Sequence, residues 1–481
     1  MRPHPNRPRL VTVAEAPGRF RLISPVTGSV VDRIPLRSAR EIRAALDGLA
    51  TDATGPEPAE IFEFLGRLRC QMQLRQGDLV ERTVLETGFI LEDCREMIQG
   101  TLDYLQNFQA YATATDMPHA SQKWNHDDSG QRAHQIARRP LRCVAGIVPQ
   151  NASVPLAVIM IASALYTGAC VAVRPSLQCG SSGILLDELI QKSAPPAGRI
   201  LVINCLADEF LEACYSTAAV DLIHYIGSNR YVREVMLRSF ESRKMCLIDG
   251  QGNGLLYVDD SFPLEEAAAL ITHAATRYNG ATCTSVNGVL ASQSIHRPLL
   301  EALTESLRGL QVGDPRRRNT AVGPLFSRGQ ATGLRAALLE SERSRLLCGG
   351  DVRCGFFAPA VFEGVDLRDP IVTHGFMGPA VWVQGLDDSQ VGEWMRANQF
   401  PLSDTILSHR EDRIHEFASS SRAARICVNV DPSIESMFEP WGGYPPSGLN
   451  PVCAWMDKYR QAYQIDSRAE FVPREARGAG R

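Results

Sequence analysis

The feature that most constrains the fold is a regular alternation of strand-like and helix-like segments between residues 143 and 240. Short apolar runs typical of buried strands cover 143–148, 170–173, 200–204 and 222–226. Segments with helical periodicity follow them, over 154–167, 182–191, 209–215 and 231–240. This alternation predicts an α/β fold, a parallel sheet with helices on both faces. Ligands of such sheets bind beyond the carboxyl ends of the strands, so the loops 149–154, 174–178 and 227–229 are expected to line one crevice.

Two other regions flank this alternation. The earlier part of the chain predicts amphipathic helices over 39–49, 59–74, 79–86 and 91–113, after a strand-like opening over 20–34. A second alternating region begins at residue 255, behind the glycine-rich stretch 249–254. Its strand-like runs include 288–291, 381–383 and 426–430. A second α/β unit is therefore expected after the first.

Composition excludes several classes of protein. With 44% hydrophobic and 22% charged residues, the chain is neither disordered nor a polytopic membrane protein. The 50 basic and 54 acidic residues leave a net charge of −4, which argues against a nucleic-acid partner. The longest apolar run, 154–166, is shorter than the roughly 20 residues that span a membrane. The start of the chain lacks the apolar core of a signal peptide, so no membrane partner and a cytoplasmic location are expected.

The 13 cysteines predict neither a disulfide framework nor a metal site. Their number is odd, their spacing is irregular, and no Cys-x-x-Cys pair occurs. Cys283 stands out because it follows a glycine-containing turn in Asn279-Gly-Ala-Thr-Cys283-Thr-Ser285. Backbone N–H groups in such a turn stabilise an oxyanion and lower the pKa of a thiol. Cys283 is therefore a candidate nucleophile, with a buried structural thiol as the alternative.

Several further motifs follow one another along the chain. They are Val148-Pro-Gln-Asn151, Val173-Arg-Pro-Ser176, Ile226-Gly-Ser228, Gly313-Asp-Pro315, Val322-Gly-Pro-Leu325, Gly355-Phe-Phe-Ala-Pro359, Gly378-Pro379, and Trp441-Gly-Gly443 with Ser447-Gly448. Each motif alone is a weak signal. In this order and spacing, over about residues 20–470, the series resembles the aldehyde dehydrogenase superfamily.

The resemblance implies a division of the chain and a function for named residues. Residues 1–250 would form an N-terminal helical segment and a Rossmann-like NAD(P)-binding domain, with an oligomerisation hairpin near 117–140. Residues 251–439 would form the catalytic domain, and residues 440–481 a C-terminal loop and oligomerisation tail. Assembly as a homodimer or homotetramer is implied as well.

By the same resemblance, Cys283 is the nucleophile and the Asn151 amide donates to the oxyanion. Pro149, Arg174, Ser176, Gly227 and Ser228 would hold the cofactor, NAD or NADP, with Arg174 and Ser176 at the adenosine ribose and Ser228 at the pyrophosphate. The implied substrate is a small aldehyde or acyl thioester, and no metal is needed.

The chain departs from the family at the position of the water-activating Glu. That position aligns with Ile248, and Asp249 beside it would face away on an extended strand. Gly250-x-Gly252-Asn253 and Asn279-Gly280 instead resemble the coenzyme A-acylating branch, whose thiol acceptor needs no such base. We therefore expect interconversion of an aldehyde and an acyl thioester, with coenzyme A as the acyl acceptor. The alternative is oxidation of an aldehyde to the carboxylic acid. It is favoured by Trp441-Gly-Gly443, which resembles the tail of the hydrolytic branch of the family.

Other departures concern the cofactor. The Glu that holds the nicotinamide ribose aligns with Gly375, and the glycine ending the phosphate loop aligns with Val232. Leu177 replaces a carboxylate that favours NAD, so a 2′-phosphate would be tolerated. These losses leave open a second alternative, a catalytically degenerate member that binds or scaffolds.

Overall fold

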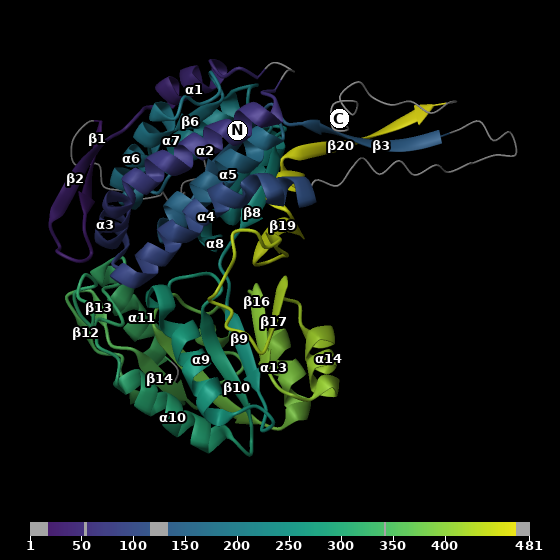
Figure 1. The fold of residues 1–481 in the computed structure, drawn as a ribbon. Helices are drawn as coiled ribbons and strands as arrows, with labels where there is room; N and C mark the ends of the chain where they lie inside the picture. Colours follow the sequence, from purple (N-terminus) through teal and green to yellow (C-terminus); the bar gives the residue numbers. More distant parts are fainter. Residues whose placement is uncertain (1–17, 52–54, 116–132, 341–342, 468–481) are drawn as a thin grey trace, which may run out of the picture.

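The computed structural model describes residues 18–51, 55–115, 133–340 and 343–467. Two seven-stranded sheets form two lobes, one above the other in Figure 1. The first sheet has the strand order β18-β19-β8-β7-β4-β5-β6, and the second has the order β11-β14-β15-β10-β9-β16-β17.

The first sheet is the parallel sheet that the alternation predicts. Its parallel strands are β4 (Cys143–Ile147), β5 (Cys170–Arg174), β6 (Ile200–Val202), β7 (Leu222–Ile226) and β8 (Met245–Asp249). The connecting helices are α5 (Ser153–Tyr166), α6 (Gly180–Lys192), α7 (Ala207–Ser216) and α8 (Asn229–Glu241). The carboxyl ends of the parallel strands share one edge, which collects the predicted cofactor loops.

Helices cover both faces of this sheet. Before it come β1 (Arg19–Ile23), β2 (Val30–Pro35), α1 (Ala39–Asp47), α2 (Pro58–Leu74), α3 (Gln76–Thr87) and α4 (Leu91–Thr115). Successive strand residues point to opposite faces. Val144 and Val171 thus join the core formed with α2, α4 and α5, whereas Ala145 and Ala172 join the core formed with α1 and α7. Burial on both faces explains why these strands are continuously apolar.

The second sheet is largely parallel too. Its strands are β9 (Gly254–Val258), β10 (Val286–Ser292), β11 (Arg345–Cys348), β14 (Ala360–Glu363), β15 (Ala380–Leu386), β16 (Ser403–Leu407) and β17 (Arg425–Val428); only β11 is antiparallel to its neighbour. Its helices include α9 (Leu264–Thr276), α10 (His296–Arg308), α11 (Arg328–Glu340), α12 (Pro370–Thr373), α13 (Val391–Ala397) and α14 (Glu411–Ser420). A small ribbon of β12 (Val352–Arg353) and β13 (Phe356–Phe357) lies beside α11.

The chain crosses between the sheets twice. Residues 250–253 connect β8 to β9, and the tail returns as β18 (Trp441–Gly443) and β19 (Gly448–Cys453), which extend the first sheet beside β8. After α15 (Trp455–Lys458), β20 (Arg460–Ser467) pairs antiparallel with β3 (Ala133–Pro140). These two strands project from the upper lobe as an arm in Figure 1.

The arm bears on the predicted oligomerisation hairpin near 117–140. Residues 117–132 of that hairpin lie outside the described residues. Residues 133–140 form β3, whose partner comes from the tail of the chain. The role of this arm in oligomerisation stays a prediction.

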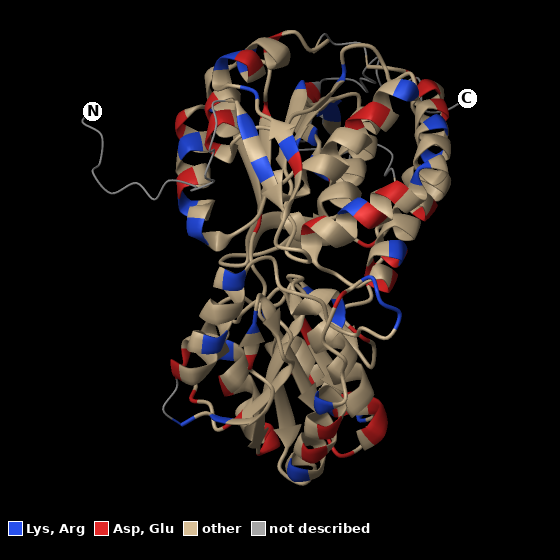
Figure 2. Cartoon of the chain, turned by 90° about the vertical axis from the view of Figure 1, so that its left-hand side faces the viewer, with Lys and Arg blue, Asp and Glu red and all other residues tan. Residues whose placement is uncertain are grey.

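Basic and acidic residues are interspersed along the outer helices of both lobes, as Figure 2 shows. All 13 cysteines lie in described residues and are free thiols. Among the described helices, none combines the length and apolar character that a membrane span requires.

Candidate active site

A left-handed turn positions the loop that carries Cys283. After α9, Tyr278, Asn279 and Gly280 adopt φ values of 51°, 55° and 62°. The buried Asn279 amide holds the turn, because its Nδ2 donates to the Gly88 and Pro324 carbonyls at 3.0 Å each. Asparagine tolerates this conformation better than other non-glycine residues. The Asn279-Gly280 pair before Cys283 thus has a structural reason of its own.

Glycines beneath the loop allow the backbone to approach closely. A Cβ atom at Gly252 would lie 1.9 Å from the Cys283 carbonyl oxygen, and one at Gly254 would lie 2.3 Å from the Ser285 carbonyl oxygen. Asn253 is buried and donates from Nδ2 to the Val372 carbonyl at 2.8 Å. The Gly-x-Gly-Asn segment therefore supports the nucleophile loop, whatever the acyl acceptor is.

The structure brings Asn151 to this loop. Asn151 lies in a turn of 3₁₀ helix, η1 (Gln150–Ala152), directly before α5. Its Nδ2 donates to the Ala281 carbonyl at 2.9 Å. A side-chain amide carries two N–H donors, so the second remains for an oxyanion formed near Cys283.

The surroundings of Cys283 keep its thiol protonated. Burial raises the pKa of the Cys283 thiol, and the carboxylates of Glu435 and Asp249 raise it further. The backbone N–H of Cys283 and the Arg425 guanidinium lower this pKa, as the turn predicts, but burial outweighs them. Since the thiolate is the nucleophile, the proton has to leave when substrate binds.

Glu435 is the carboxylate that acts most strongly on the thiol. It lies in the segment after β17 and forms an ion pair with Arg425 at 3.6 Å. Burial raises the pKa of Glu435 to about 7, against the lowering effects of Arg425 and of the Thr284 hydroxyl. The sequence gives Glu435 no role, because no spacing along the chain links it to Cys283.

The positions that correspond to the family's two glutamates, and Asp249 beside the first, have other roles in this structure. Ile248 belongs to the apolar core of the first sheet. Asp249 is buried, 2.6 Å from His224 Nε2, and accepts hydrogen bonds from Asn450 Nδ2 at 2.8 and 2.9 Å. At Gly375, a Cβ atom would lie 2.6 Å from Asn253 Oδ1, which leaves no room for a glutamate.

The residues predicted to hold the cofactor follow the carboxyl ends of β4, β5 and β7. Pro149 and Ser176 are half-buried, whereas Ser228 is exposed at the start of α8. Arg174 is buried at the end of β5, and its Nε donates to the Cys205 carbonyl at 3.1 Å. Burial lowers the pKa of Arg174. Its predicted contact with the adenosine ribose stays a prediction.

The start of α8 suits a pyrophosphate. The Ser228 hydroxyl caps the helix, and helix N-termini attract phosphate groups. Asn229 Nδ2 is a buried donor without a hydrogen-bond partner in the described part of the chain. At Gly227 a Cβ atom would lie 2.8 Å from the Tyr225 hydroxyl, so glycine leaves the backbone accessible. These residues fit a dinucleotide.

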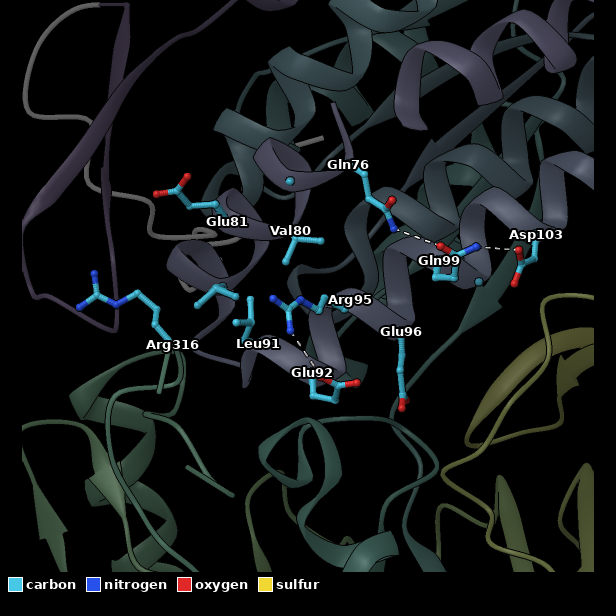
Figure 3. Close-up of a pocket in the computed structure, with 13 residues that line it drawn as sticks. Gln76, Val80, Glu81, Leu91, Glu92, Arg95, Glu96, Gln99, Asp103 and Arg316 are labelled. Atoms are coloured by element: carbon cyan, nitrogen blue, oxygen red, sulfur yellow. Dashed lines mark hydrogen bonds and ion pairs between the residues drawn. The ribbon is translucent and has the colours of Figure 1, made fainter. Parts of the chain in front are cut away.

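A separate pocket lies between α3, α4 and Arg316 (Figure 3). It has a volume of about 810 Å³, and its polar lining includes Glu92, Arg95 and Gln99. Gln99 bridges the two helices, accepting from Gln76 Nε2 at 3.1 Å and donating to Asp103 at 2.8 Å. The lining contains neither Cys283 nor Asn151, so this pocket is distinct from the candidate active site. In the residues that the structure describes, no group of His, Cys, Asp and Glu side chains could hold a metal ion.

Comparison with known proteins decides the family. The sequence profile of the aldehyde dehydrogenase family matches residues 12–465. The chain belongs to the aldehyde dehydrogenase family. This membership confirms the family resemblance of the sequence motifs. It makes the protein an oxidoreductase that acts on aldehydes with a nicotinamide cofactor.

Individual aldehyde dehydrogenases are similar over most of their length. The non-phosphorylating aspartate-semialdehyde dehydrogenase of Halomonas elongata is 25% identical over 445 residues, which cover 89% of this chain and 87% of that protein. The NAD-dependent aldehyde dehydrogenase of Sinorhizobium meliloti superposes with a TM-score of 0.86 at 24% identity, over 95% of this chain and 93% of that one. The glyceraldehyde-3-phosphate dehydrogenase GapN of Methanocaldococcus jannaschii, solved with NADP, superposes with a TM-score of 0.84 at 19% identity. The superposition covers 93% of this chain and 99% of that one. The predicted aldehyde dehydrogenase fold is confirmed.

Proposed function

We propose that this protein oxidises an aldehyde to the carboxylic acid through a thioester on Cys283, with NAD or NADP as hydride acceptor. The observation that carries this proposal is the hydrogen bond from Asn151 Nδ2 to the Ala281 carbonyl, 2.9 Å long. This contact supports a role for the Asn151 amide as oxyanion donor to the loop that carries Cys283. A thiol and an amide donor on two contacting loops are what attack on a carbonyl requires.

The chain's own residues account for the first half of the reaction. Cys283 loses its proton and adds to the aldehyde carbon, which gives a hemithioacetal. Asn151 and the Cys283 backbone N–H donate to its oxyanion. Hydride loss converts this intermediate into an acyl thioester on Cys283.

Pro149, Arg174, Ser176, Gly227 and Ser228 would hold the dinucleotide. When bound, it supplies the nicotinamide that accepts the hydride. The buried Leu177 offers no carboxylate to an adenosine ribose, so we expect both NAD and NADP to bind.

Two observations favour water as the acyl acceptor. The Gly-x-Gly-Asn segment, which resembles the acylating branch, is explained by its packing under Cys283. Glu435 also supplies a carboxylate near the thiol. The second candidate function is transfer of the acyl group to coenzyme A, or the reverse reduction of an acyl thioester. The apolar Ile248 in place of the family's Glu favours it.

One assay separates these candidates. A panel of aliphatic, aromatic, amino- and carboxy-substituted aldehydes is incubated with NAD or NADP, with and without coenzyme A, and both acid and thioester are quantified. We expect acid without coenzyme A, and loss of all turnover in Cys283→Ala. Acyl-coenzyme A as the sole product would favour the second candidate. Absence of reduced cofactor with every aldehyde would contradict both.

We also propose a homodimer or homotetramer in the cytoplasm, with a small aldehyde as the partner molecule and neither nucleic acid nor membrane. Exposed apolar side chains on α8 support self-association. Phe240 is 83% exposed, and Leu237 and Met236 lie exposed on the same helix. Apolar groups gathered in this way are typical of a subunit interface. Analytical ultracentrifugation measures the oligomeric state directly.

A further inference from the structure

The second half of the reaction needs a base that the usual position does not supply. Hydrolysis of the thioester on Cys283 requires a group to take a proton from the attacking water. Ile248 has no titratable atom and is buried. Asp249 shares its oxygens with Asn450 and His224, so it is committed to the interior of the first sheet.

Glu435 belongs to the same lobe as the nucleophile and lies in the segment that follows β17. The groups that act on its carboxyl include Thr284, the residue that follows Cys283. In turn, Glu435 acts on the Cys283 thiol more strongly than Asp249 does. The Glu435 side chain remains 31% exposed, so water can reach its carboxyl even though the surrounding protein desolvates it.

The segment that carries Glu435 is fixed along its backbone. Arg425 Nη1 donates to the Pro432 carbonyl at 2.7 Å, and Arg425 Nη2 donates to the Ile434 carbonyl at 3.3 Å. Arg277, at the base of the nucleophile turn, donates to the Ser433 carbonyl at 3.2 Å. These contacts hold the segment against the same turn that positions Cys283.

A further contact anchors the beginning of this segment. His273 Nδ1, on α9, lies 2.6 Å from Asp431 Oδ2. Because α9 leads directly into the nucleophile turn, this contact connects the start of the Glu435 segment to the start of that turn. Such support keeps a reacting group in place without the help of substrate.

We propose that Glu435 is the general base that activates water for hydrolysis of the acyl group on Cys283. This inference rests on the proposed function and deepens it. Water oxygen bonds to the thioester carbon while one water proton passes to the Glu435 carboxylate. The carbon–sulfur bond then breaks, the electron pair stays on sulfur, and the carboxylic acid leaves. No oxidant or further reactant is consumed.

The charge balance around Glu435 suits this role. Arg425 and Arg277 lower its pKa, whereas Glu439 raises it, and burial is the largest influence. The result is a pKa of about 7, at which a carboxylate is a stronger base than an ordinary glutamate and is still partly ionised. Deacylation is expected to slow as the pH falls below about 7, because protonated Glu435 accepts no proton.

The test uses para-nitrophenyl acetate, which acylates a thiol without an aldehyde or a cofactor. Full-length protein releases nitrophenolate continuously if the acetyl group on Cys283 is hydrolysed. Glu435→Gln should release about one equivalent of nitrophenolate in a burst. Its later steady-state rate should be lower than that of the unmodified protein by about 100-fold. Mass spectrometry should find the acetyl group on Cys283, and hydroxylamine, which needs no base, should restore turnover.

Control variants and outcomes make the test decisive. Glu439→Gln removes the other carboxylate of Arg425, 3.2 Å away, and should show no accumulated acetyl group. Continuous turnover by Glu435→Gln at the rate of the unmodified protein would overturn the assignment. A raised KM for amino-aldehydes with unchanged deacylation would overturn it as well, because Glu435 would then bind substrate. Since the ester needs no cofactor, failure of aldehyde oxidation in the panel is distinguishable from failure of this inference.

Discussion

Gly252 lies directly against the backbone carbonyl of Cys283. A Cβ atom at Gly252 would sit 1.9 Å from that oxygen and 3.0 Å from the carbonyl carbon. The link between the two sheets thus forms the floor under the nucleophile. Gly252→Ala has to displace the Cys283 loop, so we expect kcat to fall about 100-fold. Steady-state kinetics measure this loss; Gly66→Ala, on α2 with no atom within 4 Å of its Cβ position, should keep full activity.

Asn151→Ala tests the oxyanion donor. Removing one such donor costs about 100- to 1000-fold in kcat, because the amide acts on charge that develops during the reaction. The affinity for NAD should stay unchanged, since the amide lies at the Ala281 carbonyl. Calorimetry gives the affinity and stopped-flow absorbance gives the rate. Weaker cofactor binding with an unchanged kcat would contradict the assigned role.

Asp249→Asn tests whether this carboxylate is structural. Asp249 accepts from Asn450, whose side-chain oxygen accepts from Lys458 Nζ at 2.9 Å, while His224 Nδ1 lies 2.9 Å from the Tyr459 hydroxyl. Breaking a buried charged network is expected to lower the free energy of unfolding by about 3 kcal/mol. Chemical denaturation measures this loss, with the exposed Asp412→Asn as control. Wild-type stability together with loss of deacylation would instead make Asp249 the base.

Glu86 makes stability depend on pH. Its Oε1 accepts from the Ser181 and Ser182 N–H groups at 2.8 and 2.9 Å, while Oε2 is buried without a partner in the described residues. Burial raises the pKa of Glu86 from 4.5 to about 7. The folded state therefore holds this proton more tightly than the unfolded state, so stability present below about pH 4.5 is lost as the pH rises through about 7.

Glu86→Gln removes this titration. Relative to the unmodified protein, its free energy of unfolding should be higher at about pH 8 than at about pH 5, by up to about 3 kcal/mol. Thermal unfolding at both pH values checks the difference. The exposed Glu188→Gln should show no such trend. An equal difference at both pH values would show that Glu86 does not titrate in this range.

The first sheet was predictable because its strands are buried on both faces. The sequence predicts a strand over 222–226, and the structure has Leu222–Ile226; the helix predicted over 59–74 is Pro58–Leu74. In the second sheet, β16 (Ser403–Leu407) gave no such signal, because three of its five residues are polar despite complete burial. The edge strand β11, at the far side of the same sheet, begins with an arginine and stays partly exposed.

The site was predictable only where motifs carried it. Cys283 and Asn151 stand in recognisable motifs, and the structure places them on contacting loops. Glu435 belongs to no recognisable motif. The position of its segment depends on Arg425, Arg277 and His273, which contact that segment from separate parts of the chain. His224 is a buried core residue, and its two ring nitrogens lie at hydrogen-bond distance from Tyr459 and Asp249. Electrostatic surroundings of this kind follow from tertiary packing, which spacing along the chain does not encode.

The return of the tail to the first sheet has a consequence for how the protein is made. β19 pairs with β8, so the edge of the first sheet is completed by residues that are synthesised after the whole second sheet. Until then, the nascent chain exposes an unpaired strand edge at β8, a site for misassembly. A fragment that stops at residue 250 would keep this open edge and would lack Asn450, the partner of Asp249. Order of synthesis and order in space differ here, and the upper lobe cannot finish folding before the lower lobe has been synthesised.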